Sequence, residues 1–232
     1  MQQNNKYNIL TRWGRSQQAT AVAVLFHAIG LAGMLWGDQQ FFAKLSAYNI
    51  LLMFLLLFYT EQPISKTLFI FFTVSCLVGM MVEWIGVHTG LLFGNYQYGS
   101  TLGIKLGGVP LIIGINWFLV TYGSAMMMKK INERVKLPGG IGVVWKKILW
   151  AIDAACIAVL FDWIMEPVAV QLNYWHWSGN GSIPLYNYLC WFIVSWLLQI
   201  LFSFLPEKRI NSFAIHLLLI QTMFFLILRT FL

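Results

Sequence analysis

The chain has 232 residues, of which 59% are hydrophobic and only 10% are charged. Soluble globular domains carry about 25% charged residues, so this composition excludes a soluble domain and indicates a protein that crosses a membrane several times. The formal net charge of +7 could suggest a nucleic-acid ligand. The distribution of the basic residues argues for membrane topology instead, and we expect no nucleic-acid partner.

Seven apolar segments approach the length of about 20 residues that a helix needs to cross a bilayer. They predict an all-α, polytopic membrane helix bundle with about seven transmembrane helices, forming a single integral membrane domain over residues 1–232. The first segment is as long as a span and lacks a small-residue cleavage site, so we expect an uncleaved first helix. In chain order the segments are Ala19–Trp36, Leu45–Tyr59, Thr67–Val87, Val109–Met128, Ile148–Glu166, Leu185–Leu205 and Phe213–Phe231.

The basic residues predict the orientation of the bundle, because connections on the cytoplasmic side carry an excess of Lys and Arg. With the amino terminus inside, the inner segments hold 12 of the 15 basic residues. We therefore predict a cytoplasmic amino terminus and an outer carboxyl terminus, in a bacterial or archaeal cytoplasmic membrane. The inner set is Lys6, Arg12, Arg15, Lys66, Lys129, Lys130, Arg134, Lys136, Lys146, Lys147, Lys208 and Arg209, and the outer set is Lys44, Lys105 and Arg229.

The two longest outer connections, His88–Gly108 and Pro167–Pro184, are rich in glycine and aromatic residues and poor in charge. Ordinary solvated loops are polar, whereas aromatic loops at the bilayer surface either form an interfacial belt or cover an apolar site. A belt explains Trp175 and Trp177 but does not explain so many glycines. We therefore expect the two connections to form the roof of a site.

Three carboxylates interrupt the apolar segments: Asp162 and Glu166 in the fifth, just before Pro167, and Glu83 in the third. An ionisable side chain near the bilayer centre costs about 2.5–3.5 kcal/mol on insertion scales, so it marks a functional site by default. Alanines or glycines share the helical face of each acid, which indicates that this face is turned toward other helices. Because both segments run outward, the three acids are expected at similar depth beneath the aromatic connections.

A structural role is the alternative for these acids, because each could hydrogen-bond to Trp, Tyr or Asn and hold helices together. Lys105 is the one basic residue in the two outer connections, so no cation is well placed to neutralise all three acids. Burial and mutual repulsion both favour the neutral form of a carboxyl group. At least one of the three is therefore expected to be protonated near neutral pH and able to act as a general acid.

The remaining acids are expected to be ordinary. Asp153 lies about half a turn around the helix from Asp162, near the inner end, where Lys146 or Lys147 is a sufficient partner. The other acids lie at helix ends or in inner connections and are expected to be solvated. They are Glu61, Glu133 and Glu207.

No motif indicates a metal or cofactor. The four histidines are scattered, whereas a membrane di-iron enzyme would need clustered histidines, and the seventh segment has no lysine for a retinal Schiff base. The three cysteines lie in apolar segments, which favours buried free thiols. There is no nucleotide-binding glycine loop and no GxSxG motif. The histidines are His27, His88, His176 and His216.

Polar and aromatic groups also occur near the outer half of two other segments. Asn116 and Trp117 are neighbours in the fourth segment, and Asn187 and Trp191 share a helical face in the sixth. Interhelical packing and a role in the site are both open for these residues.

Two stretches of the chain, EWIGVHTGLLFGNYQYGSTLGIKLGGVPLIIGINW at 83–117 and FDWIMEPVAVQLNYWHWSGNGSIPLYNYLCW at 161–191, look like signature blocks. In these stretches the chain resembles the membrane carotenoid biosynthesis proteins that include the carotenoid 1,2-hydratases and bisanhydrobacterioruberin hydratase. The flanking segments match only in hydropathy. The matching positions are Glu83, Gly90, Gly94, Tyr96, Tyr98, Pro110, Trp117, Asp162, Glu166, Pro167, Trp175, Trp177, Pro184, Asn187 and Trp191.

The resemblance implies an enzyme that adds water across the terminal C1–C2 double bond of a linear, lycopene-like carotenoid and forms a tertiary alcohol without a cofactor. Hydration of this kind begins with protonation at C2, so it suits a carboxylic acid in a dry aromatic pocket. Asp162 or Glu166 is the expected acid, with Glu83 as its partner or as the base for water. The other site residues are Tyr96, Tyr98, Trp175 and Trp177 around the cation, Asn187 at the water, and Trp117 and Trp191 at the substrate.

Two other functions stay open at this point. A carotene cyclase would use the same acid on the same alkene, with a π-bond capturing the cation in place of water. A transporter or carotenoid-binding helper protein would use the acids to couple protons or to hold helices together. The expected partners are a linear carotenoid and membrane lipid, and the basic inner connection 129–147 is expected to contact anionic lipids or other carotenoid enzymes. The sequence makes no prediction of the oligomeric state.

Overall fold

The computed structural model describes residues 13–61, 63–135, 142–179, 181–206 and 209–232. Five charged residues considered above lie outside these ranges: Lys6, Arg12, Lys136, Glu207 and Lys208.

Seven long helices and the short helix α2 make up most of the described part of the chain, and the all-α class is confirmed. Six stretches are long and apolar enough to cross a membrane, with α2 and α3 together forming one of them, Gln39–Thr60. The chain is therefore an integral membrane protein. The helices are α1 (Arg15–Trp36), α2 (Gln39–Lys44), α3 (Ser46–Thr60), α4 (Lys66–Thr89), α5 (Ile112–Arg134), α6 (Val143–Gln171), α7 (Leu185–Phe204) and α8 (Ser212–Phe231).

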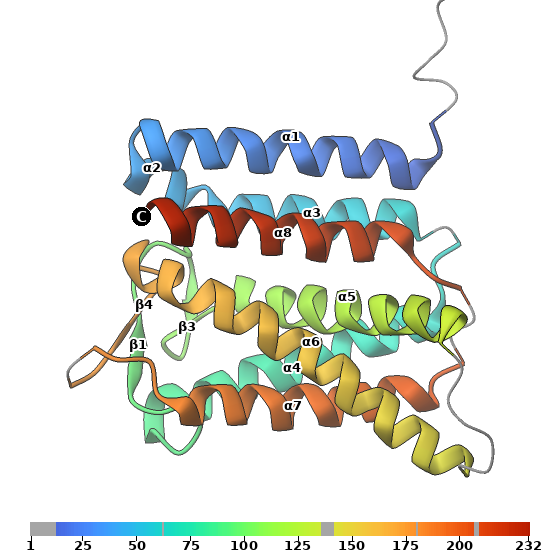
Figure 1. Ribbon diagram of the computed structural model, residues 1–232. Helices are drawn as coiled ribbons and strands as arrows, with labels where there is room; N and C mark the ends of the chain where they lie inside the picture. Colours follow the sequence, from blue (N-terminus) through green and yellow to red (C-terminus); the bar gives the residue numbers. More distant parts are fainter. Residues whose placement is uncertain (1–12, 62, 136–141, 180, 207–208) are drawn as a thin grey trace, which may run out of the picture.

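The long helices run roughly alongside one another, so the chain enters α1 at one end of the bundle and finishes α8 at the other (Figure 1). Arg15, Lys66 and Arg134 stand at or next to helix ends on the side where α1 begins. The aromatic connections lie at the other end, with the carboxyl terminus (Figure 1). This grouping agrees with the separation of basic and aromatic connections that the sequence predicts.

Helix α5 lies at the centre of the bundle and packs against α3, α4, α6, α7 and α8. It is less apolar than the other long helices, and it carries small residues where neighbours approach closely, such as Gly114 against α4 and Gly123 against α8. A helix surrounded by protein needs small contact residues more than it needs apolar bulk. Its position therefore explains why its composition alone is a weak indicator of a membrane span.

Helix α6 continues through Pro167 to Gln171, so the prediction that the outer connection begins at Pro167 is wrong by one turn. A proline inside a helix leaves the carbonyl four residues earlier without its amide donor. That carbonyl belongs to Trp163, and Arg229 of α8 donates to it at 2.9 Å. The Arg229 guanidinium also lies 4.4 Å from the centre of the Trp163 ring. One cation from the last helix thus supports the helix where the proline interrupts it.

The two aromatic connections pair with each other as an antiparallel ribbon. Strand β1 (Tyr96–Tyr98) aligns Tyr96 with Trp177 and Tyr98 with Trp175 of strand β4 (Trp175–Trp177). A second short pair joins β2 (Lys105–Leu106) to β3 (Val109–Pro110). Because Val109 and Pro110 belong to this pair, α5 begins at Ile112 and not at Val109, where the sequence predicted the fourth span to start.

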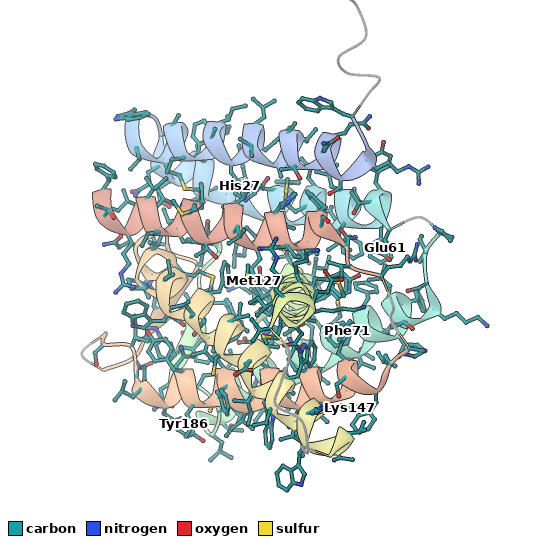
Figure 2. The ribbon with its side chains drawn as sticks, turned by 45° about the vertical axis from the view of Figure 1, so that its right-hand side comes forward. His27, Glu61, Phe71, Met127, Lys147 and Tyr186 are labelled. Atoms are coloured by element: carbon teal, nitrogen blue, oxygen red, sulfur yellow. The ribbon has the colours of Figure 1, made fainter. Side chains whose placement is uncertain are left out.

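Glu61 at the inner end of α3 is only 4% exposed, so the prediction that it is solvated is wrong. Its carboxylate accepts hydrogen bonds from Asn211 at 2.7 Å and Tyr122 at 3.4 Å, and it pairs with Arg209 at 3.2 Å. Figure 2 shows Glu61 at the opposite end of the bundle from Tyr186. These contacts tie α3, α5 and the start of α8 together, far from the aromatic ribbon.

We predict that Glu61→Ala lowers the free energy of unfolding by about 1–3 kcal/mol, because it removes the closer of the two acceptors of the buried Asn211 amide. Glu133→Ala is the matched control. Its ion pair with Lys130 is about half exposed on both sides, and such pairs contribute about 0–1 kcal/mol. Denaturation of the detergent-solubilised proteins measures both changes. Equal losses would contradict a structural role for Glu61.

Candidate functional site

Three carboxylates from two helices meet beneath the aromatic ribbon. Glu83 projects from α4, and Asp162 and Glu166 project from successive turns of α6. Asp162 is completely buried, Glu166 is 2% exposed and Glu83 is 5% exposed. The sequence-based expectation that these acids share one depth and one roof therefore describes the geometry correctly.

The Glu83 carboxylate accepts three hydrogen bonds from neutral donors. Trp117 Nε1 donates to Oε1 at 2.9 Å, Tyr98 donates to Oε2 at 2.7 Å, and Tyr96 also donates to Oε2. Burial, together with the Glu83 carboxylate, raises the pKa of Tyr96 and of Tyr98 well above the usual range for a phenol. Both hydroxyls therefore stay protonated and continue to donate.

The alternation of the ribbon turns its four aromatic residues toward the acids. Side chains of a strand point to opposite faces in turn, so the YQY and WHW triplets bury their outer members and expose Gln97 and His176. The indole groups of Trp175 and Trp177 donate to Glu166 Oε2 at 3.0 and 3.2 Å. The ribbon is therefore a roof and a source of four hydrogen-bond donors at once.

One amide joins the two acids of α6. Asn187 Nδ2 lies 3.0 Å from Asp162 Oδ2 and 3.2 Å from Glu166 Oε1, so its two hydrogens bridge the carboxyl groups. Glu166 thereby accepts three donors in total, as Glu83 does. Asp162 differs, because its Oδ1 is buried and has no hydrogen-bond partner among the described residues.

The floor of the site contains a close aromatic stack. The rings of Trp117 and Trp191 are 3.9 Å apart and nearly parallel, at 10°. Gly79 of α4 makes room for this stack, since a Cβ atom there would lie 2.6 Å from the Trp117 ring. Gly79 lies one turn before Glu83 on the same face of α4, and its lack of a side chain is required for the close approach of α4 and α5.

All ten residues that the sequence proposed for the site line one cavity of about 370 Å³. It also contains Asn116, which the sequence left open, and the apolar Phe93, Ile113 and Met165. Lys105, the one outer cation considered for the acids, donates to the Tyr98 carbonyl at 2.6 Å. The ten residues are Glu83, Tyr96, Tyr98, Trp117, Asp162, Glu166, Trp175, Trp177, Asn187 and Trp191.

Several residues outside the acid cavity differ from what the sequence predicted. Asp153 lies on the exposed surface of α6 and forms no ion pair with a described residue, so a partner at Lys146 or Lys147 is not present. Asn49 and Gln221 line a second cavity, together with His27, which the sequence treated as one of several scattered histidines. Their polarity inside apolar helices was the signal that could have identified them.

Comparison with known proteins adds the family. A family profile described as carotenoid biosynthesis protein matches residues 44–232, which include every helix from α3 to α8 and the whole cavity. The chain belongs to the carotenoid biosynthesis protein family. The family resemblance that the sequence suggested is thereby confirmed, and the protein has a role in carotenoid biosynthesis.

One curated protein that is similar to this chain has a named enzymatic activity. The bisanhydrobacterioruberin hydratase of Haloarcula japonica is 22% identical over 195 residues. The match covers 79% of this chain and 64% of the relative, so the chain spans less than two thirds of the length of that protein. No solved structure matches the chain.

We predict that Gly79→Ala lowers the free energy of unfolding, because the new methyl group forces the Trp117 ring to shift. Overpacking of this kind costs about 1–3 kcal/mol. Gly30→Ala is the control, since its Cβ would meet only Phe224, at an ordinary 3.7 Å. That variant should gain up to about 1 kcal/mol from reduced backbone entropy in the unfolded chain. Denaturation in detergent compares them, and equal effects would mean that the Trp117 stack adapts freely.

Proposed function

We propose that this protein hydrates the terminal C1–C2 double bond of a linear, lycopene-like carotenoid and forms a tertiary alcohol. The observation that carries the proposal is the contrast between the three acids. Glu83 and Glu166 each accept three hydrogen bonds, while Asp162 Oδ1 lies buried in the same cavity with no partner in the described part of the chain. Family membership and the hydratase name of the distant relative support the same activity.

Asp162 is the proton donor in this proposal. A carboxyl group whose hydrogen bonds are all accepted ones is suited to the ionised state, because a carboxylate can accept hydrogen bonds but has no hydrogen to donate. Glu83 and Glu166 fit that description. Asp162 accepts the Asn187 amide through Oδ2, which leaves Oδ1 to carry a proton toward the substrate. Neutral Asp162 also avoids placing three negative charges in one buried cavity without a cation.

The reaction begins when the Asp162 proton adds to C2 of the alkene, forming a C–H bond and leaving a cation at the tertiary C1. Trp175, Trp177 and the Trp117–Trp191 stack offer aromatic faces to that cation, and a cation–π contact is worth about 2 kcal/mol when desolvated. The Glu83 and Glu166 carboxylates add fixed negative charge that stabilises the developing positive charge.

Water completes the reaction. Its oxygen forms a bond to C1, and the proton that it loses passes to Glu166. Asn187 holds the Glu166 and Asp162 carboxyl groups together by donating to both. The proton then passes from Glu166 to the Asp162 carboxylate and restores neutral Asp162. The net change is addition of H and OH across one double bond, and no cofactor takes part.

Expression in lycopene-producing cells grown in H₂¹⁸O tests the activity directly. We expect a new pigment heavier than lycopene by one or two labelled waters, identified by chromatography and mass spectrometry. An isomer of unchanged mass would replace the hydratase proposal with a cyclase. Unchanged lycopene, with the protein present in the membrane, would favour the carotenoid-binding or transport function.

We predict that Asp162→Asn lowers hydration at least about 100-fold, because general acid catalysis typically contributes 10²–10⁴-fold. The amide retains the shape of the side chain, so insertion and the unfolding temperature should stay close to those of the parent.

Asp153→Asn is the matched control, since it makes the same change on the exposed face of the same helix. Activity should be unchanged in that variant. Full activity in Asp162→Asn would remove Asp162 from the acid role.

A further inference from the structure

A second cavity of about 550 Å³ lies directly beside the acid cavity. The two share four lining residues: Ile113, Asn116, Met165 and Trp175. The second cavity is otherwise lined by residues of α1, α3 and α8 and by Leu102 and Tyr174 near the aromatic ribbon. It therefore lies between these helices and the wall of the site.

The lining of this cavity is unusually polar for the interior of a membrane protein. Six side chains contribute donors or acceptors, and they come from four helices and one connection. They are His27, Ser46, Asn49, Asn116, Tyr174 and Gln221. Figure 2 shows His27 between α1 and α8, and its side chain is buried.

Several of these groups have incomplete hydrogen bonding within the described part of the chain. The Gln221 side chain is only 5% exposed, and neither it nor Asn116 forms a hydrogen bond with a described residue. Asn49 Oδ1 is also buried without a partner. Polar groups in a membrane interior require a partner, and a polar cavity of sufficient size provides one as water.

The remaining polar groups of the lining contact one another or the backbone. Ser46 and Tyr174 bond to each other at 2.5 Å, and His27 Nδ1 contacts the Ala23 carbonyl at 2.8 Å. Asn49 Nδ2 lies 3.4 Å from His27 Nε2. Burial raises the pKa of Tyr174 to about 12, so its hydroxyl stays neutral.

We infer that this cavity holds the water that hydration consumes, and that Asn116 passes it to the cation in the acid cavity. The inference rests on the proposed function and specifies the source of one reactant. The acid cavity is covered by aromatic residues, so water for C1 must come from a particular side. The second cavity has room for water-sized molecules, and its polar side chains can bind them.

Asn116 is the polar residue on the shared wall that has donors and acceptors to spare. Ile113 and Met165 are apolar, and the Trp175 indole already donates to Glu166. An amide offers two donors and an acceptor. The Asn116 amide can therefore hold a water molecule in place while a lone pair of the water oxygen points at the cation.

This arrangement also favours hydration over cyclisation. The cation at C1 can be captured by water, captured by a π-bond of its own chain, or returned to an alkene by loss of a proton. A polar reservoir beside the cavity raises the chance of the first outcome. Loss of that reservoir should leave protonation intact and shift the cation toward the other two.

The test separates protonation from water capture in D₂O. Membranes with the parent protein, Gln221→Leu or Asn116→Leu are supplied with a linear carotenoid of the lycopene class. Hydrated product is measured alongside deuterium in the recovered substrate. Deuterium enters at C2 from the acid, and loss of a proton from C2 or from a C1 methyl group then regenerates an alkene that retains the label. Thr222→Val, on the same helix but lining neither cavity, is the control.

We expect each Leu variant to hydrate at least tenfold more slowly while deuterium exchange into the substrate stays at the parental rate or rises. Gln221→Asn should restore part of the hydration. Unfolding temperatures and membrane yield confirm that the variants fold.

Parental hydration in both Leu variants, or an equal loss of hydration and exchange in folded protein, would overturn the water route while leaving hydratase activity in place. Parent protein that shows neither hydration nor exchange would instead overturn the proposed function and the inference together.

Discussion

The site depends on burying three acidic side chains with neutral donors in place of cations. Each charged group taken from water needs compensation, and lysine or arginine is the usual source. Here the compensation comes from indole, phenol and amide hydrogens, and the nearby cations Lys105 and Arg229 bind backbone carbonyls instead. Neutral donors hold negative charge in place without cancelling it. The charge therefore remains available to stabilise a carbocation.

This constraint explains much of the outer half of the fold. Two distant connections must pair in register so that tyrosines from one and tryptophans from the other reach the acids. Helix α6 must continue past Pro167 before the chain returns as β4, and Arg229 of α8 supports it there. Gly79 must lack a side chain so that Trp117 can reach Glu83 while it stacks on Trp191. The ribbon, the proline and the glycine serve the same arrangement of donors.

The sequence predicted the helical bundle and the residues of the site well, since both follow from local patterns. The lengths of the apolar segments predict the membrane spans, and acids on helix faces with small residues predict the site. The pairing of the ribbon depends on contacts between residues about 80 positions apart, which no local pattern specifies. Helix α6 passes Pro167 because of Arg229, more than 60 residues away, and Glu61 is buried by residues of two other helices. The polar cavity around Gln221 is likewise created by packing of five helices.

The central claim is that one acid, Asp162, is neutral while its two neighbours are ionised. Infrared spectroscopy of the detergent-solubilised protein tests it directly, because a protonated carboxyl group has a carbonyl stretching band that a carboxylate lacks. The account predicts such a band in the parent protein, its loss in Asp162→Asn and its retention in Glu83→Gln and Glu166→Gln. A band that persists in Asp162→Asn and disappears in one of the glutamate variants would assign the proton to that glutamate and contradict the account.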